Sequence, residues 1–386
     1  MHILIVLTYF QPHKSGLTVY AVRQAQALAV RGHEVTVLTS QYDRVLPLDE
    51  TVEGVHIVRL PVAFRLSKGV IMPQMPIKAW QLMDEADVVN LHVPQLDSAL
   101  LAVMAKLRHK PIVLTYHCDL EMPVGLINKL AGWAANIANS ISAKLADAIV
   151  HNTRDFAEHS PFLKNYLHKL SVIQPPIKVE PASEADIQRF REKYNIQPGQ
   201  RVVGMVARLA TEKGVEYLVQ AMPKVVQAVP DARTVFVGEY QRVFGEETYL
   251  KKLLPMIDDL GDSWTFLGVI SELEKAVFFK VCDVLVLPSI NSTESFGMVQ
   301  VEAMTSGTPV IATDLPGVRQ PVQSTGMGEI VPLRDAVALA GAIIRVLQSG
   351  KEISPAGKEA LVNFYSPETI AETYEKLFVD LLEENG

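Results

Sequence analysis

Short apolar segments of strand-like composition alternate with helical periodicity along almost the whole chain, and this alternation predicts a parallel α/β fold. In the first half we expect strands at 3–7, 35–39, 55–60, 88–91, 112–115, 148–151 and 171–173. In the second half we expect them at 202–206, 234–237, 265–267, 284–287, 310–312 and 329–331. Helices are expected between them, for example over 16–31, closed by Gly32, and over 95–108, followed by Pro111.

A proline-containing segment, 174–184, divides these two series of strands. It includes Pro175, Pro176 and Pro181, which resist regular structure. We therefore expect two Rossmann-like domains, 1–175 and 176–365, with a last helix over 366–386 that packs back on the first domain. Ligands of open α/β sheets bind beyond the carboxyl ends of the strands, so residues that directly follow strands are the candidates for function.

Composition narrows the class of protein. The chain has 386 residues, and its 48% hydrophobic content is ample for two cores. A net charge of −7 argues against a protein that binds duplex nucleic acid. The two cysteines, Cys118 and Cys282, offer neither a disulfide framework nor zinc-ligand spacing, which favours a reducing, cytoplasmic location. The apolar start is too short for a signal peptide, and no stretch is long and apolar enough to span a bilayer.

Two glutamates, Glu294 and Glu302, follow the expected strand 284–287 and have seven residues between them. Ser295 is a fair N-cap for a helix over 296–305, and Gly307 is a good C′ residue. The start of such a helix attracts phosphate through free backbone N–H groups. Here those groups would belong to Phe296, Gly297, Met298 and Val299.

A carboxylate at Glu302 could accept hydrogen bonds from neutral hydroxyls in the same local unit. A nucleotide sugar carries hydroxyls at both ends and phosphates between them, and it therefore suits this arrangement.

Two cations, Arg208 and Lys213, bracket a turn after the expected strand 202–206 and could clamp a diphosphate. They would stabilise the negative charge that builds on a departing nucleoside diphosphate. The alternative is an ordinary solvated loop, since isolated Arg and Lys usually belong to one. No Asp-x-Asp motif occurs, so a metal bridging the diphosphate through such a pair is not supported.

Two candidates in the first half are open to a plain structural explanation. Gly16, at the entrance of the expected helix 16–31, would let a phosphate approach the backbone, or it simply eases a turn. His117, with Asp119 two residues on, follows the strand 112–115 and could contact a substrate, or it is a structural histidine bonded to a backbone carbonyl. His92 ends the strand before it in the same way, with less support.

The segment 126–145 has apolar residues at helical spacing. They are Leu126, Leu130, Trp133, Ile137, Ile141 and Leu145. Such a helix could lie on a membrane surface or could pack on its own sheet, and the latter is favoured because only Lys129 and Lys144 supply positive charge nearby.

Three segments together resemble the retaining glycosyltransferases of family four, which have the GT-B fold of two Rossmann-like domains facing across a cleft. The matching segments are 206–214 (VARLATEKG), 283–289 (DVLVLPS) and 294–312 (ESFGMVQVEAMTSGTPVIA). The resemblance spans essentially the whole chain and is most specific in the second half. The sequence departs from the family pattern where Ser15 precedes Gly16 and where Gly238 is followed by Glu-Tyr-Gln.

The resemblance implies a role for each candidate. Domain 1–175 would bind the acceptor, and domain 176–365 would bind the nucleotide-sugar donor. Arg208 and Lys213 would hold the donor diphosphate, Glu294 the sugar hydroxyls and Glu302 the ribose. Phe296, Gly297, Met298, Val299 and Gly16 would supply backbone contacts, the loop at Ile270 would meet the nucleobase, and His117 would lie beside the reacting sugar.

The expected function is therefore a retaining, metal-independent hexosyltransferase with no cofactor. Its donor would be a UDP- or GDP-sugar and its acceptor a saccharide or a lipid-linked molecule, in glycan, glycolipid or cell-surface polysaccharide synthesis. We expect it in the cytoplasm, with possible peripheral contact at the inner membrane face. Two alternatives stay open: a nucleotide-sugar epimerase of the same fold, and a non-catalytic nucleotide-sugar-binding protein. Retention of all four charged candidates favours an enzyme.

Overall fold

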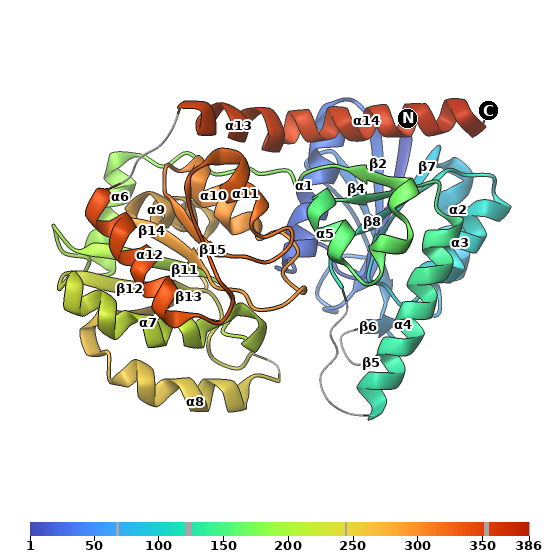
Figure 1. The fold of residues 1–386 in the computed structure, drawn as a ribbon. Coiled ribbons are helices and arrows are strands. Elements are labelled where there is room, and N and C mark those ends of the chain that lie inside the picture. Colours follow the sequence, from blue (N-terminus) through green and yellow to red (C-terminus); the bar gives the residue numbers. More distant parts are fainter. Residues whose placement is uncertain (67–68, 120–125, 244, 351–354, 386) are drawn as a thin grey trace. The chain divides into compact units, whose positions relative to one another are not determined.

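The computed structural model describes residues 1–66, 69–119, 126–243, 245–350 and 355–385. They form two compact units, Met1–Pro176 with Phe364–Gly386, and Ile177–Asn363. The division after Pro176 lies within the proline-containing segment, where residues 173–183 have no regular structure. Each unit is built on a mainly parallel sheet with helices packed against it (Figure 1).

In the described part of the first unit, eight strands form one sheet in the order β10-β9-β8-β7-β1-β2-β4-β3. The strands are β1 His2–Val6, β2 Glu34–Gln41, β3 Asp49–Val52, β4 Val55–Pro61, β7 Val88–Val93, β8 Ile112–Tyr116, β9 Ala148–His151 and β10 Leu170–Val172. A separate hairpin consists of β5 Phe64–Leu66 and β6 Gly69–Ile71. The helices are α1 Gly16–Val30, α2 Met75–Glu85, α3 Ser98–Leu107, α4 Leu126–Leu145, α5 Arg154–His159 and α14 Pro367–Asn385.

The described part of the second unit holds a six-stranded sheet in the order β13-β12-β11-β14-β15-β16. The strands are β11 Arg201–Val206, β12 Ala232–Val237, β13 Trp264–Gly268, β14 Val284–Leu287, β15 Val310–Thr313 and β16 Gly328–Val331. The helices are α6 Glu184–Lys193, α7 Val215–Ala228, α8 Glu247–Asp258, α9 Glu272–Val281, α10 Met298–Thr305, α11 Gln320–Thr325 and α12 Ala336–Ser349. Helix α13, Pro355–Tyr365, contains the boundary at residue 363.

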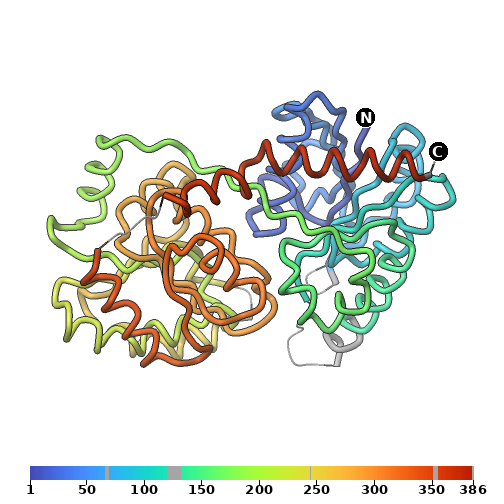
Figure 2. The backbone as a smooth tube through the Cα atoms, turned by 45° about the horizontal axis from the view of Figure 1, so that its top comes forward, coloured from blue at the N-terminus to red at the C-terminus, as the bar shows by residue number. Residues whose placement is uncertain are grey.

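The last helix, α14, packs along α1 of the first unit (Figure 2). Tyr374 of α14 is fully buried, and its hydroxyl lies 2.7 Å from that of Tyr20 on α1. Arg31 and Glu375 form an ion pair between the same helices. A segment far away in the sequence therefore completes the first unit through buried aromatic contacts.

The strands that sequence periodicity did not predict are β3, β5 and β6. Strand β3 pairs antiparallel with β4 at the edge of the sheet. Its sequence, Asp-Glu-Thr-Val, lacks an apolar run because its side chains alternate between exposed and partly buried positions. The short hairpin likewise lies outside the main sheet, so neither feature has the continuous apolar signature of a buried parallel strand.

Candidate active site

The carboxyl ends of β11 and β14 lie side by side in the second unit. Counted from β11, its strand order is 3-2-1-4-5-6, and the order reverses between the first and fourth strands. Ligands of open α/β sheets bind at such a switch point. The loop 207–214 follows β11 and the loop 288–297 follows β14, so the strongest sequence candidates meet at the expected place.

Gly214 brings these two loops into close contact. It has a φ of +63°, and a Cβ atom there would lie 2.0 Å from the carbonyl oxygen of Pro288. The backbone N–H of Ile290 also donates to the carbonyl of Glu212 over 3.0 Å. Glycine is therefore needed at 214 for both its backbone conformation and the close approach.

Lys213 and Glu294 form an ion pair between the two loops. The ammonium nitrogen lies 2.6 Å from Glu294 Oε2, and the side chains are only 19% and 15% exposed. Arg208 instead pairs with Glu212 over 3.1 Å, and its side chain is half exposed. The structure thus joins Lys213 to Glu294, while Arg208 is directed to a carboxylate of its own loop.

Helix α10 begins later than predicted. The expectation of a helix from 296 with Ser295 as N-cap is wrong, because α10 starts at Met298 and its N-cap is Gly297. Gly297 has a φ of +77°, and a Cβ atom there would lie 2.4 Å from Leu287 Cδ2. The chain turns into the helix through this left-handed glycine, so Phe296 precedes the helix. The predicted C′ position is confirmed, since Gly307 follows the C-cap Ser306 with a φ of +84°.

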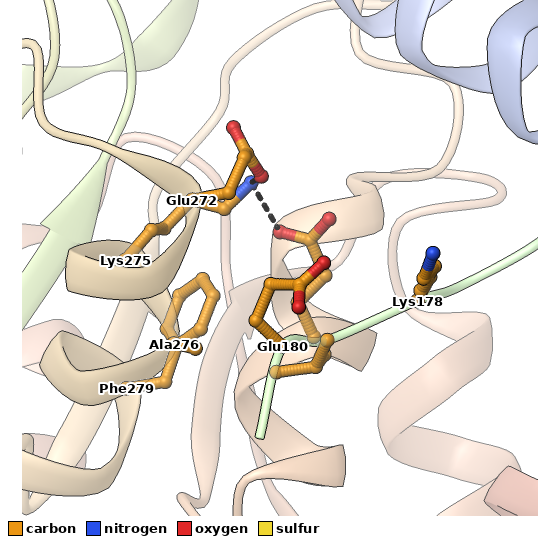
Figure 3. Close-up of a pocket in the computed structure, with 8 residues that line it drawn as sticks. Lys178, Glu180, Glu272, Lys275, Ala276 and Phe279 are labelled. Carbon is orange, nitrogen blue, oxygen red and sulfur yellow. Dashed lines mark ion pairs between the residues drawn. The ribbon is translucent and has the colours of Figure 1, made fainter. Parts of the chain in front are cut away.

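Glu302 lies on α10 and lines a small pocket in the second unit. The Lys275 ammonium nitrogen lies 2.7 Å from Glu272 Oε2 and 3.4 Å from Glu302 Oε2. The Glu302 side chain is 3% exposed. Figure 3 shows Lys275, Ala276 and Phe279 along α9, with Lys178 and Glu180 on the segment that enters the unit. Lys275 is not among the candidates that the sequence pattern indicates. Its only signal was a lysine one helical turn after Glu272, at the start of a helix.

Ile270 lies in the loop that follows β13, on the same edge of the sheet as the loops after β11 and β14. It is partly buried, and Val269 beside it is 67% exposed. Next to this loop, Tyr240 stacks on Phe266 with ring centroids 4.2 Å apart. The edge therefore offers backbone groups beside an aromatic pair.

In the first unit, Gly16 is the first residue of α1. Its neighbour Ser15 is the N-cap, and the Ser15 hydroxyl accepts a hydrogen bond from the backbone N–H of Thr18. Strand order in this sheet reverses between β1 and β7, so the start of α1 lies at the switch point of the first unit.

His117 follows β8 and is 8% exposed. Its Nε2 atom lies 2.9 Å from Nδ1 of the buried His92. This nitrogen therefore does not form the bond to a backbone carbonyl that the structural alternative predicts. Asp119 turns to the hydroxyls of Tyr116 and Ser160. Burial lowers the pKa of His117 well below its ordinary value and that of His92 to about 3, so both rings are neutral near pH 7.

Helix α4 turns three of its large apolar side chains outward. Trp133 is 67% exposed, and Ile137 and Ile141 are also exposed, whereas small residues such as Ala138 and Ala143 are buried. The favoured interpretation, in which the apolar stripe packs on the sheet, is therefore wrong for these three residues. Leu126 and Leu130 lie outside the residues whose side chains are described. No helix in the described residues has the length and hydropathy of a membrane span.

The neighbouring helices α2 and α3 share this property. The exposed large apolar residues of the three helices are Ile77, Trp80, Leu100, Val103, Leu107, Trp133, Ile137 and Ile141. Helix α3 packs on both α2 and α4 (Figure 1). The sequences of α3 and α4 contain no acidic residue, although the chain has 43. We call these eight residues the apolar face of the first unit.

Comparison with known proteins covers nearly the whole chain. Residues 14–180 match Glycosyltransferase Family 4, and residues 186–362 match Glycosyl transferases group 1. One relative is the phosphatidyl-myo-inositol mannosyltransferase of Mycolicibacterium smegmatis, 28% identical over 90% of this chain and 85% of the relative. Another is the alpha-monoglucosyldiacylglycerol synthase of Acholeplasma laidlawii, 23% identical over 100% of this chain and 98% of the relative.

Solved structures share the fold across both units. Anabaena HepE in complex with UDP aligns with a TM-score of 0.78 at 21% identity, covering 98% of this chain and 100% of that one. Sucrose-phosphate synthase from Thermosynechococcus elongatus aligns with a TM-score of 0.77 at 22% identity, covering 99% of both chains. These structures show that the fold is GT-B, and the two family matches show that the class of protein is a glycosyltransferase. Within that class, the chain belongs to the glycosyl transferases group 1, and it is a hexosyltransferase.

Proposed function

We propose that this hexosyltransferase is a retaining, metal-independent enzyme that moves a sugar from a UDP- or GDP-sugar to an acceptor hydroxyl. The observation that carries the proposal is the partly buried pair of Lys213 and Glu294 at the switch point between β11 and β14. A cation and a carboxylate held at one point can bind a diphosphate and the hydroxyls of its sugar together. The UDP named in the structure of Anabaena HepE supports a nucleotide donor.

Each candidate residue takes a role in this proposal. Lys213 and Arg208 hold the diphosphate, Glu294 the sugar hydroxyls and Glu302 the ribose hydroxyls. The backbone from Phe296 to Val299 and at Gly16 approaches the phosphates, while the loop at Ile270 contacts the base. His117 lies beside the reacting sugar. Lys213 is already paired with Glu294, so donor binding exchanges part of this contact for contacts to the phosphate and the sugar.

The chemistry follows from charge at the leaving group. The bond from the sugar's anomeric carbon to the diphosphate oxygen breaks, and the bond to the acceptor oxygen forms on the same face. The acceptor proton passes to the departing diphosphate. Lys213, Arg208 and the N–H groups before α10 stabilise that developing charge in place of a metal ion. Turnover should therefore be unchanged by EDTA.

An acceptor-dependence assay separates this function from its alternatives. Release of nucleoside diphosphate would be measured with a panel of UDP- and GDP-sugars, with and without phosphatidylinositol, diacylglycerol or soluble sugars. A transferase releases nucleoside diphosphate only when an acceptor is present. For a retaining enzyme, NMR of the product shows the same anomeric configuration as in the donor. Epimerisation of the donor without any acceptor would support the epimerase, and binding without turnover would support the non-catalytic protein. Glu294→Gln should abolish the acceptor-dependent signal.

We also propose a lipid-linked acceptor and contact of the apolar face with the inner membrane surface. The names of the two relatives, which include phosphatidyl-myo-inositol and diacylglycerol, support such an acceptor. Exposed tryptophans at 80 and 133 have the amphipathic character favoured at membrane interfaces. Lys144 is exposed on α4, a helix without acidic residues, and it complements an anionic surface, whereas Lys106 on α3 is paired with Asp147.

Vesicle flotation tests the membrane contact. The wild-type chain should float with vesicles containing phosphatidylglycerol and less with pure phosphatidylcholine. The triple variant Trp133→Ser, Ile137→Ser, Ile141→Ser should lose flotation but keep its melting temperature, because these side chains contact solvent. The control variant replaces Val337 and Leu254, exposed apolar residues of the second unit, with serine in the same way. It should float as the wild-type chain does. Membrane contact through α4 would be refuted if the triple variant floats as well as the wild-type chain. It would also be refuted if light scattering shows that the wild-type chain is a dimer and the triple variant is not.

A further inference from the structure

The loop after β11 is held from a second side by the segment that leads from the end of β12 into α8. The backbone N–H of Ala207 donates to the carbonyl of Val237 over 2.9 Å. The N–H of Leu209 donates to the carbonyl of Glu239 over 2.7 Å. A Cβ atom at Gly238 would lie 2.0 Å from the carbonyl oxygen of Ala207. The first half of the loop is therefore fixed by close backbone contacts.

The second half of the loop is held by a side chain. Residues 211–213 form a 3₁₀-helical turn, and its N-cap is Ala210, whose methyl group cannot accept a hydrogen bond. Thr211 donates twice to Glu246 Oε2, from its backbone N–H over 3.1 Å and from its hydroxyl over 2.7 Å. Hydrogen bonds to a carboxylate are roughly twice as strong as bonds between neutral groups. Glu246, at the start of α8, therefore anchors the start of this turn.

Tyr249, in the first turn of α8, holds the chain on the other side of Lys213. Its hydroxyl accepts from the backbone N–H of Glu216 over 3.1 Å and donates to the carboxylate of the same residue. Both residues are buried, and Glu216 is the second residue of α7. Helices α7 and α8 also pack on each other (Figure 1). The start of α8 therefore binds the chain both before and after Lys213.

The position of the Lys213 ammonium depends on the backbone that carries it. Lysine bears a point charge on a flexible stem, unlike the rigid fork of arginine. The ion pair with Glu294 is the contact that donor binding would partly exchange for a contact to phosphate. After that exchange, the turn 211–213 determines where the ammonium lies. A misplacement of about 1 Å can lower the rate of an enzyme by roughly 100-fold, so the anchoring of this turn matters for catalysis.

We propose that Glu246 is a positioning residue of the donor site, which fixes the turn 211–213 through Thr211 and so sets where the Lys213 ammonium meets the donor diphosphate. This role rests on the proposed function, in which Lys213 binds that diphosphate. Glu246 acts through the turn and not by contact with the donor. A neutral side chain of the same shape that still accepts both hydrogen bonds should therefore replace it.

Amide hydrogen exchange of the full chain tests the turn without any turnover. The backbone N–H groups of Thr211, Lys213 and Gly214 are all hydrogen-bonded in the structure. We expect Glu246→Ala to speed exchange in the peptide 211–214 about tenfold, because both bonds from Thr211 are lost. Glu246→Gln should leave exchange nearly unchanged, because its amide oxygen can accept both bonds. Wild-type exchange in Glu246→Ala would overturn the proposal.

A double-mutant cycle tests whether the turn acts through Lys213. With the acceptor found in the acceptor-dependence assay, we expect Glu246→Ala to lower kcat about tenfold in the wild-type chain. In Lys213→Met the same change should have an effect of less than about twofold, because the group that Glu246 positions is gone. Glu246→Gln should keep most of the rate. The control Glu247→Ala, which removes an exposed carboxylate from the first turn of α8, should keep it too.

The outcomes separate positioning from folding and from charge. An equal loss of kcat for Glu246→Ala with and without Lys213 would mean that Glu246 only stabilises the fold. A loss for Glu246→Gln as large as that for Glu246→Ala would mean that its charge matters and not its hydrogen bonds. Either result, or an unchanged kcat in Glu246→Ala, refutes the positioning role. If the wild-type chain shows no turnover but exchange responds as stated, Glu246 holds the turn and the proposed function fails.

Discussion

The two units place different kinds of polar group at their switch points, neutral groups in the first unit and charged groups in the second. All ten histidines of the chain lie in the first unit and none in the second. They are His2, His13, His33, His56, His92, His109, His117, His151, His159 and His168. The site in the first unit is a buried network of neutral rings and amides, whereas that in the second joins lysines to carboxylates at Glu294 and Glu302.

This difference reflects what each kind of group needs in order to be buried. A neutral ring needs only a donor and an acceptor in the right places, and strands β7 and β8 supply them through backbone and side chains. A buried charge needs an opposite charge, so Lys213 and Glu294 depend on each other. The stability of the first unit should therefore depend on pH. The second unit should be sensitive to the removal of one charged side chain.

Acid should destabilise the first unit most. Burial lowers the pKa of His92 to about 3 and that of His151 to about 4, against about 6.5 in an unfolded chain. Between about pH 4 and 6.5 the unfolded state binds more protons than the folded state. The free energy of unfolding therefore falls as pH falls, on the order of 2–3 kcal/mol per pH unit for this pair. Above about pH 6.5 the contribution is fully present.

The three tryptophans allow each unit to be followed separately. Trp80 and Trp133 belong to the first unit and Trp264 to the second. Urea unfolding would be followed by fluorescence at pH 7 and 5.5, using Trp264→Phe for the first unit and the double variant Trp80→Phe, Trp133→Phe for the second. An equal loss of stability in both units would contradict the comparison.

Removing the charge of Lys213 tests the second unit. Lys213→Met keeps the length of the side chain but leaves Glu294 without its cation and the donor diphosphate without a counter-charge. We expect kcat to fall roughly 10²–10³-fold, the effect of losing one group that stabilises transition-state charge. Steady-state kinetics with the acceptor found in the acceptor-dependence assay would measure it. The exposed Lys251→Met on α8 is the control, and a fall of less than tenfold for Lys213→Met would refute the role.

Buried strands and motifs of consecutive residues could be predicted from the sequence, whereas contacts between distant elements could not. Buried parallel strands were predicted in place, such as β9 and β14 with both ends matched, because both faces of such strands are apolar. The motif 294–312 led directly to the loop beside β14, since its residues are consecutive. Charged candidates on one loop were therefore readable from sequence.

Partners that come from distant elements were not readable. Lys275 reaches Glu302 from another helix, and His92 on β7 reaches His117 after β8. The start of α10 was misplaced because Gly297 takes a left-handed conformation under Leu287, which no helix-cap pattern announces. The outward stripe of α4 was misjudged because small residues, not large ones, form its packed side. In each case tertiary packing overrides the local pattern.

Gly214→Ala tests whether the charged site depends on close backbone approach. A Cβ atom at 214 would meet Pro288 at 2.0 Å in a left-handed conformation, so we expect a loss of roughly 2–3 kcal/mol in the free energy of unfolding. Donor binding should weaken as the loops after β11 and β14 separate. Gly199→Ala is the matched control, because its φ is +87° but nothing lies within 4 Å of the added atom. Equal losses for both variants in urea unfolding would mean that conformation alone, and not the contact between loops, requires glycine at 214.

The smallest effect should come from the other ion pair of the same loop. Arg208 and Glu212 lie 3.1 Å apart with the arginine side chain half exposed, and surface pairs contribute about 0–1 kcal/mol because water already solvates both charges. Glu212→Gln should therefore change the free energy of unfolding by less than about 1 kcal/mol. Because this carboxylate no longer competes for Arg208, the KM for the donor should stay the same or fall. A rise in donor KM would mean that Glu212 holds Arg208 in its binding position, and exposure would then be a poor guide to which pair of this loop the donor needs.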